Sequence, residues 1–146
     1  LESDCAPLGA LLEAATSCGA ELHAAHDPTR GGVATTCCEV ADRAGLRIVL
    51  EEEAVPLRPQ VAATCELLGL EPLYLACEGR ALLWAPERDA QRLLDALRAH
   101  PQGRDATVIG QVAARSNGQG GVALRNAFGG ERPLDLLSGM DLPRIC

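Results

Sequence analysis

The chain has 146 residues and a formal net charge of −7 at pH 7, and 47% of its residues are hydrophobic but only 2% aromatic. This length is typical of one domain, whose core must be built from aliphatic side chains. Because the chain is acidic, has few aromatic residues and contains no lysine, we expect neither a nucleic-acid partner nor lysine chemistry such as a Schiff base.

Helical periodicity and glycine stops divide the first half of the chain. The predicted elements are a helix at 8–18, a strand or connector at 22–25, a helix at 33–44 and a strand at 46–50. Gly19 and Gly45 directly follow the two helices, where glycine readily adopts the left-handed conformation that ends a helix. We interpret Glu51-Glu52-Glu53 as a solvated strand end, since a run of like charges usually marks a surface.

Prolines and polar turns divide the second half. The predicted elements are a helix at 59–68, strands at 73–76 and 81–84, a helix between Pro86 and Pro101, and strands at 107–112 and 121–124. We predict two hairpin-like strand pairs, one around Cys77-Glu78-Gly79 and one across the polar turn 116–120. Four helices and four or five strands indicate an α/β fold in which a mixed β-sheet is covered by helices.

Seven cysteines occur without a recognisable metal or disulfide spacing: Cys5, Cys18, Cys37, Cys38, Cys65, Cys77 and Cys146. Their odd number argues against a disulfide framework, so we expect mainly buried thiols in a reducing compartment, the cytoplasm, and no metal site. We interpret the adjacent Cys37 and Cys38 as helix packing. No signal peptide or membrane span is predicted, and the start at Leu1 suggests the C-terminal part of a longer protein.

The strongest local signal is Asp27-Pro28-Thr29-Arg30-Gly31-Gly32, just before a predicted helix. Its glycines would leave backbone N–H groups at the positive end of the helix dipole, which suits a phosphate. Thr29 is placed to cap the helix, Arg30 to bind a phosphate with two hydrogen bonds, and Asp27 to fix the turn or a metal. The alternative is an ordinary capped loop in which the glycines only supply the turn.

Two further positions carry candidate chemistry. Glu78 falls between two predicted apolar strands, where burial would raise its pKa and suit it to accept a proton, although a surface hairpin position is the alternative. Cys146 places a thiol on the free chain end. We predict a domain at 1–138 and a mobile tail at 139–146 that could extend roughly 26–29 Å. The alternative is that the cysteine stands there by accident.

Together these stretches resemble the HypE family of hydrogenase maturation factors, within the superfamily of aminoimidazole ribonucleotide synthetase. The stretches are Asp27–Gly32, Cys65–Leu70, Cys77–Gly79, Asp105–Gly110 and Pro143–Cys146. The match runs from near the first helix to the last residue and corresponds to the C-terminal domain of that family. The glycine stretch indicates only the superfamily, whereas the terminal Pro-Arg-Ile-Cys selects the HypE family.

The resemblance implies an ATP-dependent carbamoyl dehydratase that works as a homodimer, with an N-terminal ATP-binding domain that is absent here. The partner HypF would place a carbamoyl group on the thiol of Cys146. ATP, with Mg2+, would then activate the carbamoyl oxygen, and loss of phosphate would leave a thiocyanate. The cyano group would pass to iron on the HypC–HypD complex and become a ligand of nickel–iron hydrogenase. Glu78 would serve as the base, and Arg30 with Gly31 and Gly32 would face the nucleotide.

One position departs from the family pattern, because Cys77 stands where the family commonly has asparagine before Glu78. Two other classes of function stay open. The chain could belong to another ATP-dependent member of the superfamily, such as a purine synthetase, a selenophosphate synthetase or a thiamine phosphate kinase. It could also be a non-catalytic docking module. We expect negligible ATP turnover by this chain alone, because the lysine and acidic phosphate ligands would lie in the absent domain.

Overall fold

The computed structural model describes residues 3, 5–115 and 121–136. The chain forms two compact units, and each is built from two separate stretches of sequence. The first unit combines Leu1–Pro28 with Cys77–Val108, and the second combines Thr29–Ala76 with Ile109–Cys146. The tail predicted at 139–146 lies outside the described residues, so the division at 138 stays a prediction.

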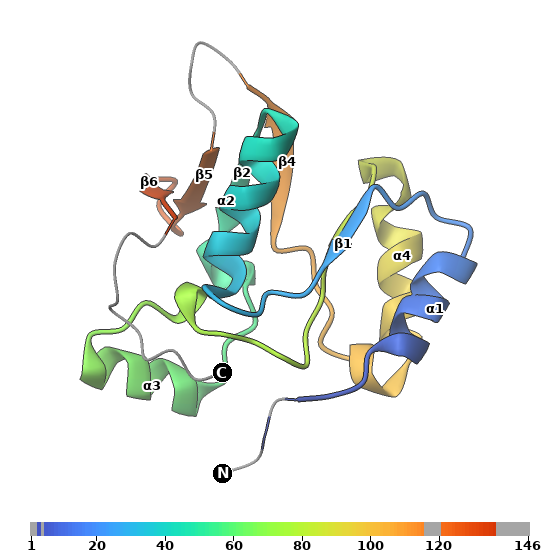
Figure 1. The fold of residues 1–146 in the computed structure, drawn as a ribbon, viewed down its shortest axis with the longest axis horizontal. Helices are drawn as coiled ribbons and strands as arrows, with labels where there is room; N and C mark the ends of the chain where they lie inside the picture. The colour runs from blue at the N-terminus through green and yellow to red at the C-terminus, as the bar shows by residue number, and fades with distance from the viewer. Residues whose placement is uncertain (1–2, 4, 116–120, 137–146) are drawn as a thin grey trace. The chain divides into compact units, whose positions relative to one another are not determined.

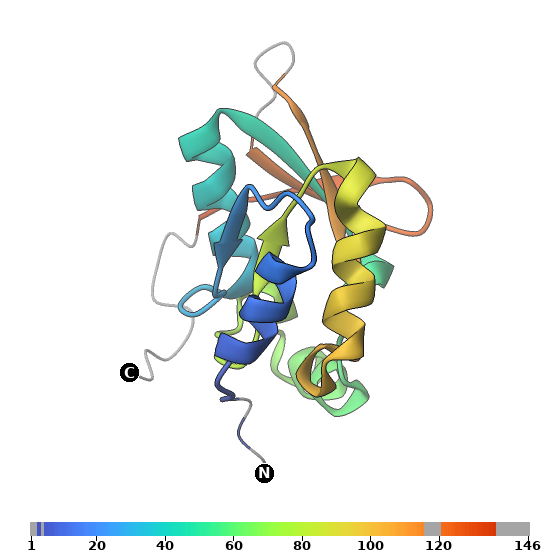
Figure 2. The same cartoon turned by 90° about the vertical axis from the view of Figure 1, so that its right-hand side faces the viewer.

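The first unit consists of two helices and a two-stranded antiparallel sheet (Figures 1 and 2). Its elements are α1 (Gly9–Ser17), β1 (Ala24–His26), β3 (Leu82–Trp84), α4 (Glu87–Ala99) and the 3-10 helix η3 (Pro101–Gly103). Leu11 and Ala15 of α1 are buried against Leu93 and Leu97 of α4. Both pairs are four residues apart, so each helix presents one apolar stripe to the other. The predicted first and fourth helices are thereby confirmed.

The predicted hairpin around Cys77-Glu78-Gly79 is wrong. β3 pairs with β1, so that Leu83 lies opposite Ala25. Residues Pro72–Tyr74 form the 3-10 helix η2 instead of a strand. Proline fixes φ and has no N–H for a strand ladder, and the Glu71 carboxylate accepts a hydrogen bond from the Leu73 N–H at 3.4 Å. These local contacts favour a tight turn over an extended strand.

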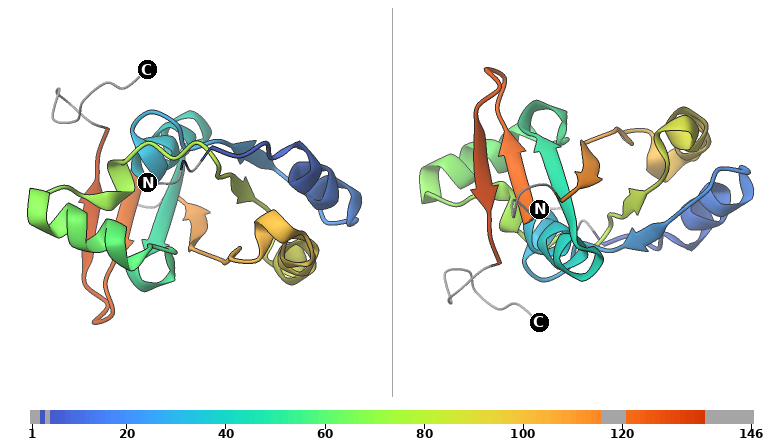
Figure 3. Two further views of the ribbon diagram at one scale, coloured as in Figure 1. Left: turned by 90° about the horizontal axis from the view of Figure 1, so that it is seen from below. Right: turned by 90° about the horizontal axis from the view of Figure 1, so that it is seen from above.

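The second unit is a four-stranded sheet with helices. Its elements are α2 (Gly32–Ala44), β2 (Leu46–Glu51), the 3-10 helix η1 (Glu52–Ala54), α3 (Pro59–Leu68), η2, β4 (Gly110–Ala114), β5 (Gly121–Arg125) and β6 (Glu131–Leu134). The strand order is β4-β2-β5-β6, with β2 and β5 parallel and the other pairs antiparallel (Figure 3, right). The predicted mixed sheet with helices is therefore confirmed.

The second predicted hairpin is also wrong, because β2 lies between β4 and β5. Ile48, Val49 and Leu50 are consecutive and all at least 96% buried, although successive strand residues point to opposite faces. A strand that is apolar on both faces needs cover on both sides and a neighbour at each edge, so it takes a central place in the sheet. The polar turn at 116–120 lies outside the described residues.

Helix α2 covers one face of this sheet (Figure 1). Its buried residues recur at helical spacing and are Gly32, Val33, Ala34, Thr36, Cys37, Cys38 and Ala41. Cys37 and Cys38 are thus part of the helix packing, as predicted. Gly45 ends α2 with φ 64°, and Gly69 ends α3 with φ 65°. Strand β6 was not predicted, since its sequence Glu-Arg-Pro-Leu is polar and contains a proline that only an edge strand tolerates.

Candidate functional site

In the first unit, the structure joins two of the candidate segments. The backbone N–H of Cys77 donates to the carbonyl oxygen of Pro28 at 3.0 Å. This bond fixes the turn that carries Glu78 beside the segment that carries Asp27. Asp27 is exposed, and its carbonyl oxygen lies 2.7 Å from Nδ1 of His26. The two candidate carboxylates therefore come from segments that are tied together through their backbones.

Glu78 is exposed at a turn, which corrects the expectation that two apolar strands would bury it. It lines a surface hollow of about 270 Å³ together with Cys5, Ala6 and Pro7. Solvent therefore reaches this carboxylate unless a bound group covers it.

In the second unit, the glycine stretch forms the start of α2. Gly31 is the N-cap residue with φ 78°, and Gly32 has φ 61°, so both lie in the left-handed region that favours glycine. A Cβ on Gly31 would lie 2.2 Å from Oγ1 of Thr35. A Cβ on Gly32 would lie 2.4 Å from the carbonyl oxygen of Leu75. Both glycines are therefore required by backbone conformation and by close packing.

Thr29 does not cap α2, which corrects the sequence prediction. The N-cap residue is Gly31, and no side chain caps the helix. Thr29 contributes its carbonyl oxygen instead, which accepts a hydrogen bond from the N–H of Gly32 at 3.2 Å. This bond uses one of the two glycine amides that were expected to face a ligand.

The start of α2 still suits an anionic group. Its first turn contains no acidic residue, and the exposed Arg30 immediately precedes the glycines. Oγ1 of Thr35 is buried, and no described residue forms a hydrogen bond with it. The first amides of a helix have no partner within the helix, and its dipole is positive at this end. A phosphate group fits these donors and this charge.

Cys146 lies outside the described residues, and near the end of the described chain Leu134 and Asp135 are held by side-chain hydrogen bonds. The Tyr74 hydroxyl donates to the carbonyl oxygen of Asp135 at 2.8 Å and accepts from the Asp135 N–H at 3.2 Å. The buried Cys38 thiol donates to the carbonyl oxygen of Leu134 at 3.2 Å. Sequence reasoning missed Tyr74, whose only signal was its rarity as one of three aromatic residues.

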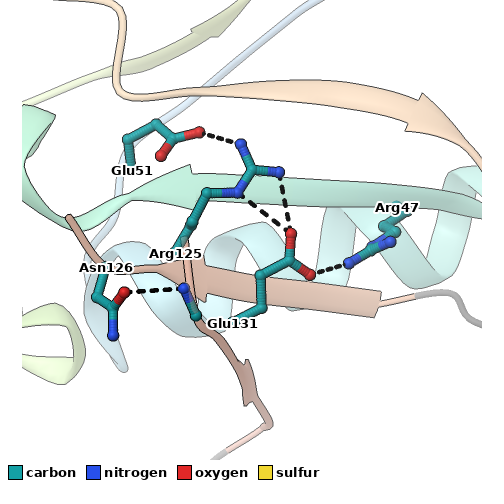
Figure 4. Close-up of polar contacts among 6 residues, drawn as sticks. Arg47, Glu51, Arg125, Asn126 and Glu131 are labelled. Carbon is teal, nitrogen blue, oxygen red and sulfur yellow. Dashed lines mark hydrogen bonds and ion pairs between the residues drawn. The ribbon is translucent and has the colours of Figure 1, made fainter. Parts of the chain in front are cut away.

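A chain of ion pairs crosses three strands of the sheet on the side away from α2 (Figure 4). Arg125 binds Glu51 at 2.7 Å and Glu131 at 2.9 Å, and Arg47 also binds Glu131. Hydrogen bonds from Arg125 hold the pKa of the Glu131 carboxyl below its usual value, and the charge of Arg47 adds to this effect. The solvated strand end predicted at Glu51-Glu52-Glu53 is confirmed for the exposed Glu52 and Glu53, whereas Glu51, the last residue of β2, is the half-buried partner of Arg125.

Neither a metal cluster nor a membrane helix occurs within the described part of the chain. There, no three histidine, cysteine, aspartate or glutamate residues come together in a way that could hold a metal ion. None of the described helices combines the length and apolar character needed to cross a bilayer.

The model of the AIR synthase related protein, C-terminal domain, matches residues 1–123. The chain belongs to this family. Carbamoyl dehydratase HypE of Rhodobacter capsulatus is 49% identical over 146 residues, which are 100% of this chain and 42% of that protein. The crystal structure of Escherichia coli HypE has a TM-score of 0.90 at 40% identity and covers 100% of this chain and 44% of its own.

Two further solved structures extend the comparison within the AIR synthase related family. A HypE structure in complex with ATP has a TM-score of 0.86 at 38% identity, covering 95% of this chain and 43% of its own. A HypE–HypF complex has a TM-score of 0.85 at 32% identity, covering 92% of this chain and 43% of its own. The chain thus spans less than half the length of the relatives that it matches.

Proposed function

We propose that this chain is the C-terminal part of an ATP-dependent carbamoyl dehydratase that carries its substrate on Cys146. The observation behind the proposal is the 49% identity to a carbamoyl dehydratase over all 146 residues, which include the terminal Pro-Arg-Ile-Cys. In the proposed reaction, a carbamoyl group on sulfur loses its oxygen and two protons and becomes a thiocyanate. The thiocyanate would then supply the cyano ligand of nickel–iron hydrogenase.

Cys146 acts in this proposal as nucleophile and carrier. A thiolate attacks well and can later release the carbon of the cyano group to a metal. ATP, when bound, supplies the phosphoryl group that turns the carbamoyl oxygen into a leaving group. The start of α2 supports a phosphate site, because Arg30 offers positive charge there and the Thr35 hydroxyl has no hydrogen-bond partner among the described residues. Gly31 and Gly32 provide the left-handed backbone from which the helix begins. Asp27 and Thr29 belong to the same proposed nucleotide-binding stretch.

Glu78 is the proposed base that removes protons from the carbamoyl nitrogen. Its exposed position means that the substrate carried on Cys146 must exclude water from the carboxylate when the two meet. The bond between Cys77 and Pro28 supports this role, since it fixes the Glu78 turn through backbone atoms alone. In this proposal, Cys146 at the chain end carries the substrate to Glu78, which the turn holds in place.

The partners and setting follow from the same proposal. HypF is the proposed donor of the carbamoyl group, supported by a solved HypE–HypF complex of relatives. The HypC–HypD complex is the proposed acceptor of the cyano group. We further propose that the full-length protein is a homodimer in the cytoplasm and that it binds ATP together with Mg2+. The proposed Mg2+ and ATP ligands belong mainly to the N-terminal domain, so this chain alone should not turn over ATP.

The deciding experiment uses the full-length protein with HypF, carbamoyl phosphate and ATP, followed by mass measurement of the C-terminal peptide. We expect a carbamoyl adduct on Cys146 without ATP and a cyano adduct with ATP. Cys146→Ala should abolish both adducts and hydrogenase maturation. If maturation survives this change, the proposed carrier role is wrong.

A second candidate is another ATP-dependent enzyme of the superfamily, such as a purine synthetase. The family model favours it equally, since AIR synthase related proteins share this domain. Such enzymes do not need a terminal cysteine. ATP-dependent activity of the full-length protein that survives deletion of the last four residues would support this candidate. Absence of any ATP turnover in the full-length protein would instead favour the docking module.

A further inference from the structure

The backbone of Asp135 is held at both of its polar groups by one side chain. The Tyr74 hydroxyl donates to the carbonyl oxygen of Asp135 and accepts from its N–H, at 2.8 Å and 3.2 Å. Asp135 follows the end of β6 at Leu134, so no strand ladder holds it. A tyrosine hydroxyl can donate and accept at once, whereas phenylalanine can do neither.

A second side chain, that of Cys38, holds Leu134, the residue before Asp135. The Cys38 thiol of α2 donates to the carbonyl oxygen of Leu134, and both residues are buried. The path of the chain is thus fixed at two consecutive residues by side chains from two different elements, α2 and η2. Burial raises the pKa of the Cys38 thiol to about 11, so the sulfur keeps the proton that it donates.

The backbone of the η2 segment also touches the glycine stretch. A Cβ on Gly32 would lie 2.5 Å from the carbonyl oxygen of Leu73 and 2.9 Å from the carbonyl carbon of Tyr74. The residue that holds Asp135 with its hydroxyl therefore packs its own backbone against the first residue of α2. Gly32, Tyr74 and Asp135 form one continuous set of contacts within the second unit.

We propose that Tyr74 is a positioning residue for the carrier cysteine, because it fixes the point from which the chain runs to Cys146 relative to the start of α2. This inference rests on the proposed function. Eleven residues follow Asp135 in the sequence, and fully extended they span about 36–40 Å. A reacting group on such a tether meets its site more often when the tether starts from a fixed place and direction.

The test compares Tyr74→Phe with the wild type in the full-length protein, loaded with the carbamoyl group by HypF. We expect the single-turnover rate of cyano formation to fall about five- to tenfold, the size that loss of two modest hydrogen bonds would give. The rate of carbamoyl loading and the KM for ATP should stay within about twofold. We expect this difference between the two rates because Tyr74 is proposed to act at the start of α2, where dehydration takes place, and not at the loading step.

Arg132→Gln is the matched control. Arg132 of β6 pairs with Glu71 beside η2, so this variant removes an ion pair between the same two segments without touching Asp135. We expect wild-type rates from it. Hydrogen exchange should also be faster by about fivefold at the Asp135 amide in Tyr74→Phe, and unchanged in Arg132→Gln.

The outcomes separate this inference from the function on which it rests. If the wild type forms no cyano adduct, the proposed function fails. If the wild type forms the cyano adduct and Tyr74→Phe forms it at the same rate, the positioning role is wrong. An equal fall in loading and dehydration, with a lower melting temperature, would also overturn it by showing only a structural role.

Discussion

The N–H of Cys77 and the carbonyl oxygen of Pro28 form a hydrogen bond of 3.0 Å between segments far apart in the sequence. The link uses only the backbone of Cys77, so a different side chain at this position leaves it intact. The position of the turn therefore does not depend on which side chain residue 77 carries, provided that residue keeps its backbone N–H.

We therefore predict that Cys77→Asn keeps the free energy of unfolding within about 0.5 kcal/mol of the wild type. Thermal and urea unfolding of this chain would check the prediction. Cys77→Pro serves as the contrast, because proline has no N–H and removes the bond to Pro28. Equal stability of the two variants would show that the bond contributes nothing.

Gly32→Ala should destabilise the second unit by about 3 kcal/mol or more, since the new Cβ meets backbone carbonyl groups at a positive φ. Gly45→Ala is the matched control at the other end of α2. It has φ 64° and nothing within 4 Å of the added Cβ, so we expect a cost of only about 1 kcal/mol. Urea denaturation gives both values, and equal costs would mean that packing against η2 is unimportant.

The ion pairs of Glu131 predict a pH dependence of stability. Because Arg125 and Arg47 lower the pKa of Glu131 in the folded chain, this group stabilises the fold above the usual glutamate pKa. The contribution is lost as the pH falls through the lower folded value. The wild type should therefore exceed Glu131→Gln in melting temperature at pH 7, and the difference should shrink below about pH 4.5.

Glu53→Gln supplies the comparison, because Glu53 is exposed and forms no ion pair within the part of the chain that the structure describes. Its melting temperature should follow that of the wild type over the whole pH range. Added salt should reduce the Glu131 difference, since these side chains are partly exposed. A difference that persists unchanged at pH 3 would contradict the ion-pair explanation.

The buried cysteines should resist alkylation. Burial raises the pKa of the Cys37 thiol to about 12 and of the Cys38 thiol to about 11, so little reactive thiolate exists at pH 8. Cys5 is exposed. With iodoacetamide, peptide mass mapping should find Cys5 modified well before Cys37 and Cys38, and urea should abolish this order. Rapid modification of Cys38 in the folded chain would contradict its bond to Leu134.

Local signals predicted the helices well. Pro59 and Gly69 mark both ends of α3, and the four-residue spacing of Leu93 and Leu97 places both on the inner face of α4. Such features depend on residues a few positions apart, which the sequence displays directly. The α/β class was predictable for the same reason, because it follows from the kinds of elements that the chain contains.

Strand pairing was less predictable, because hairpin rules consider only neighbouring segments. They cannot show that the strand containing Ile48, Val49 and Leu50 pairs along its two edges with two later strands, β4 and β5. The features of the candidate site likewise fall into those that the local sequence predicts and those that depend on distant segments. Gly31 and Gly32 stand where the motif suggested, whereas the exposure of Glu78 and the double hydrogen bond of Tyr74 depend on segments that only folding brings together.

The central place of β2 has a consequence for synthesis on the ribosome. All the segments of the first unit are complete once Val108 has been made, whereas β2 must wait for β4 and β5, which begin at Gly110 and Gly121. During that interval an apolar strand with two open edges is exposed, which is a hazard for aggregation. The first unit can therefore fold early, and the nascent chain is most vulnerable just before its second unit closes.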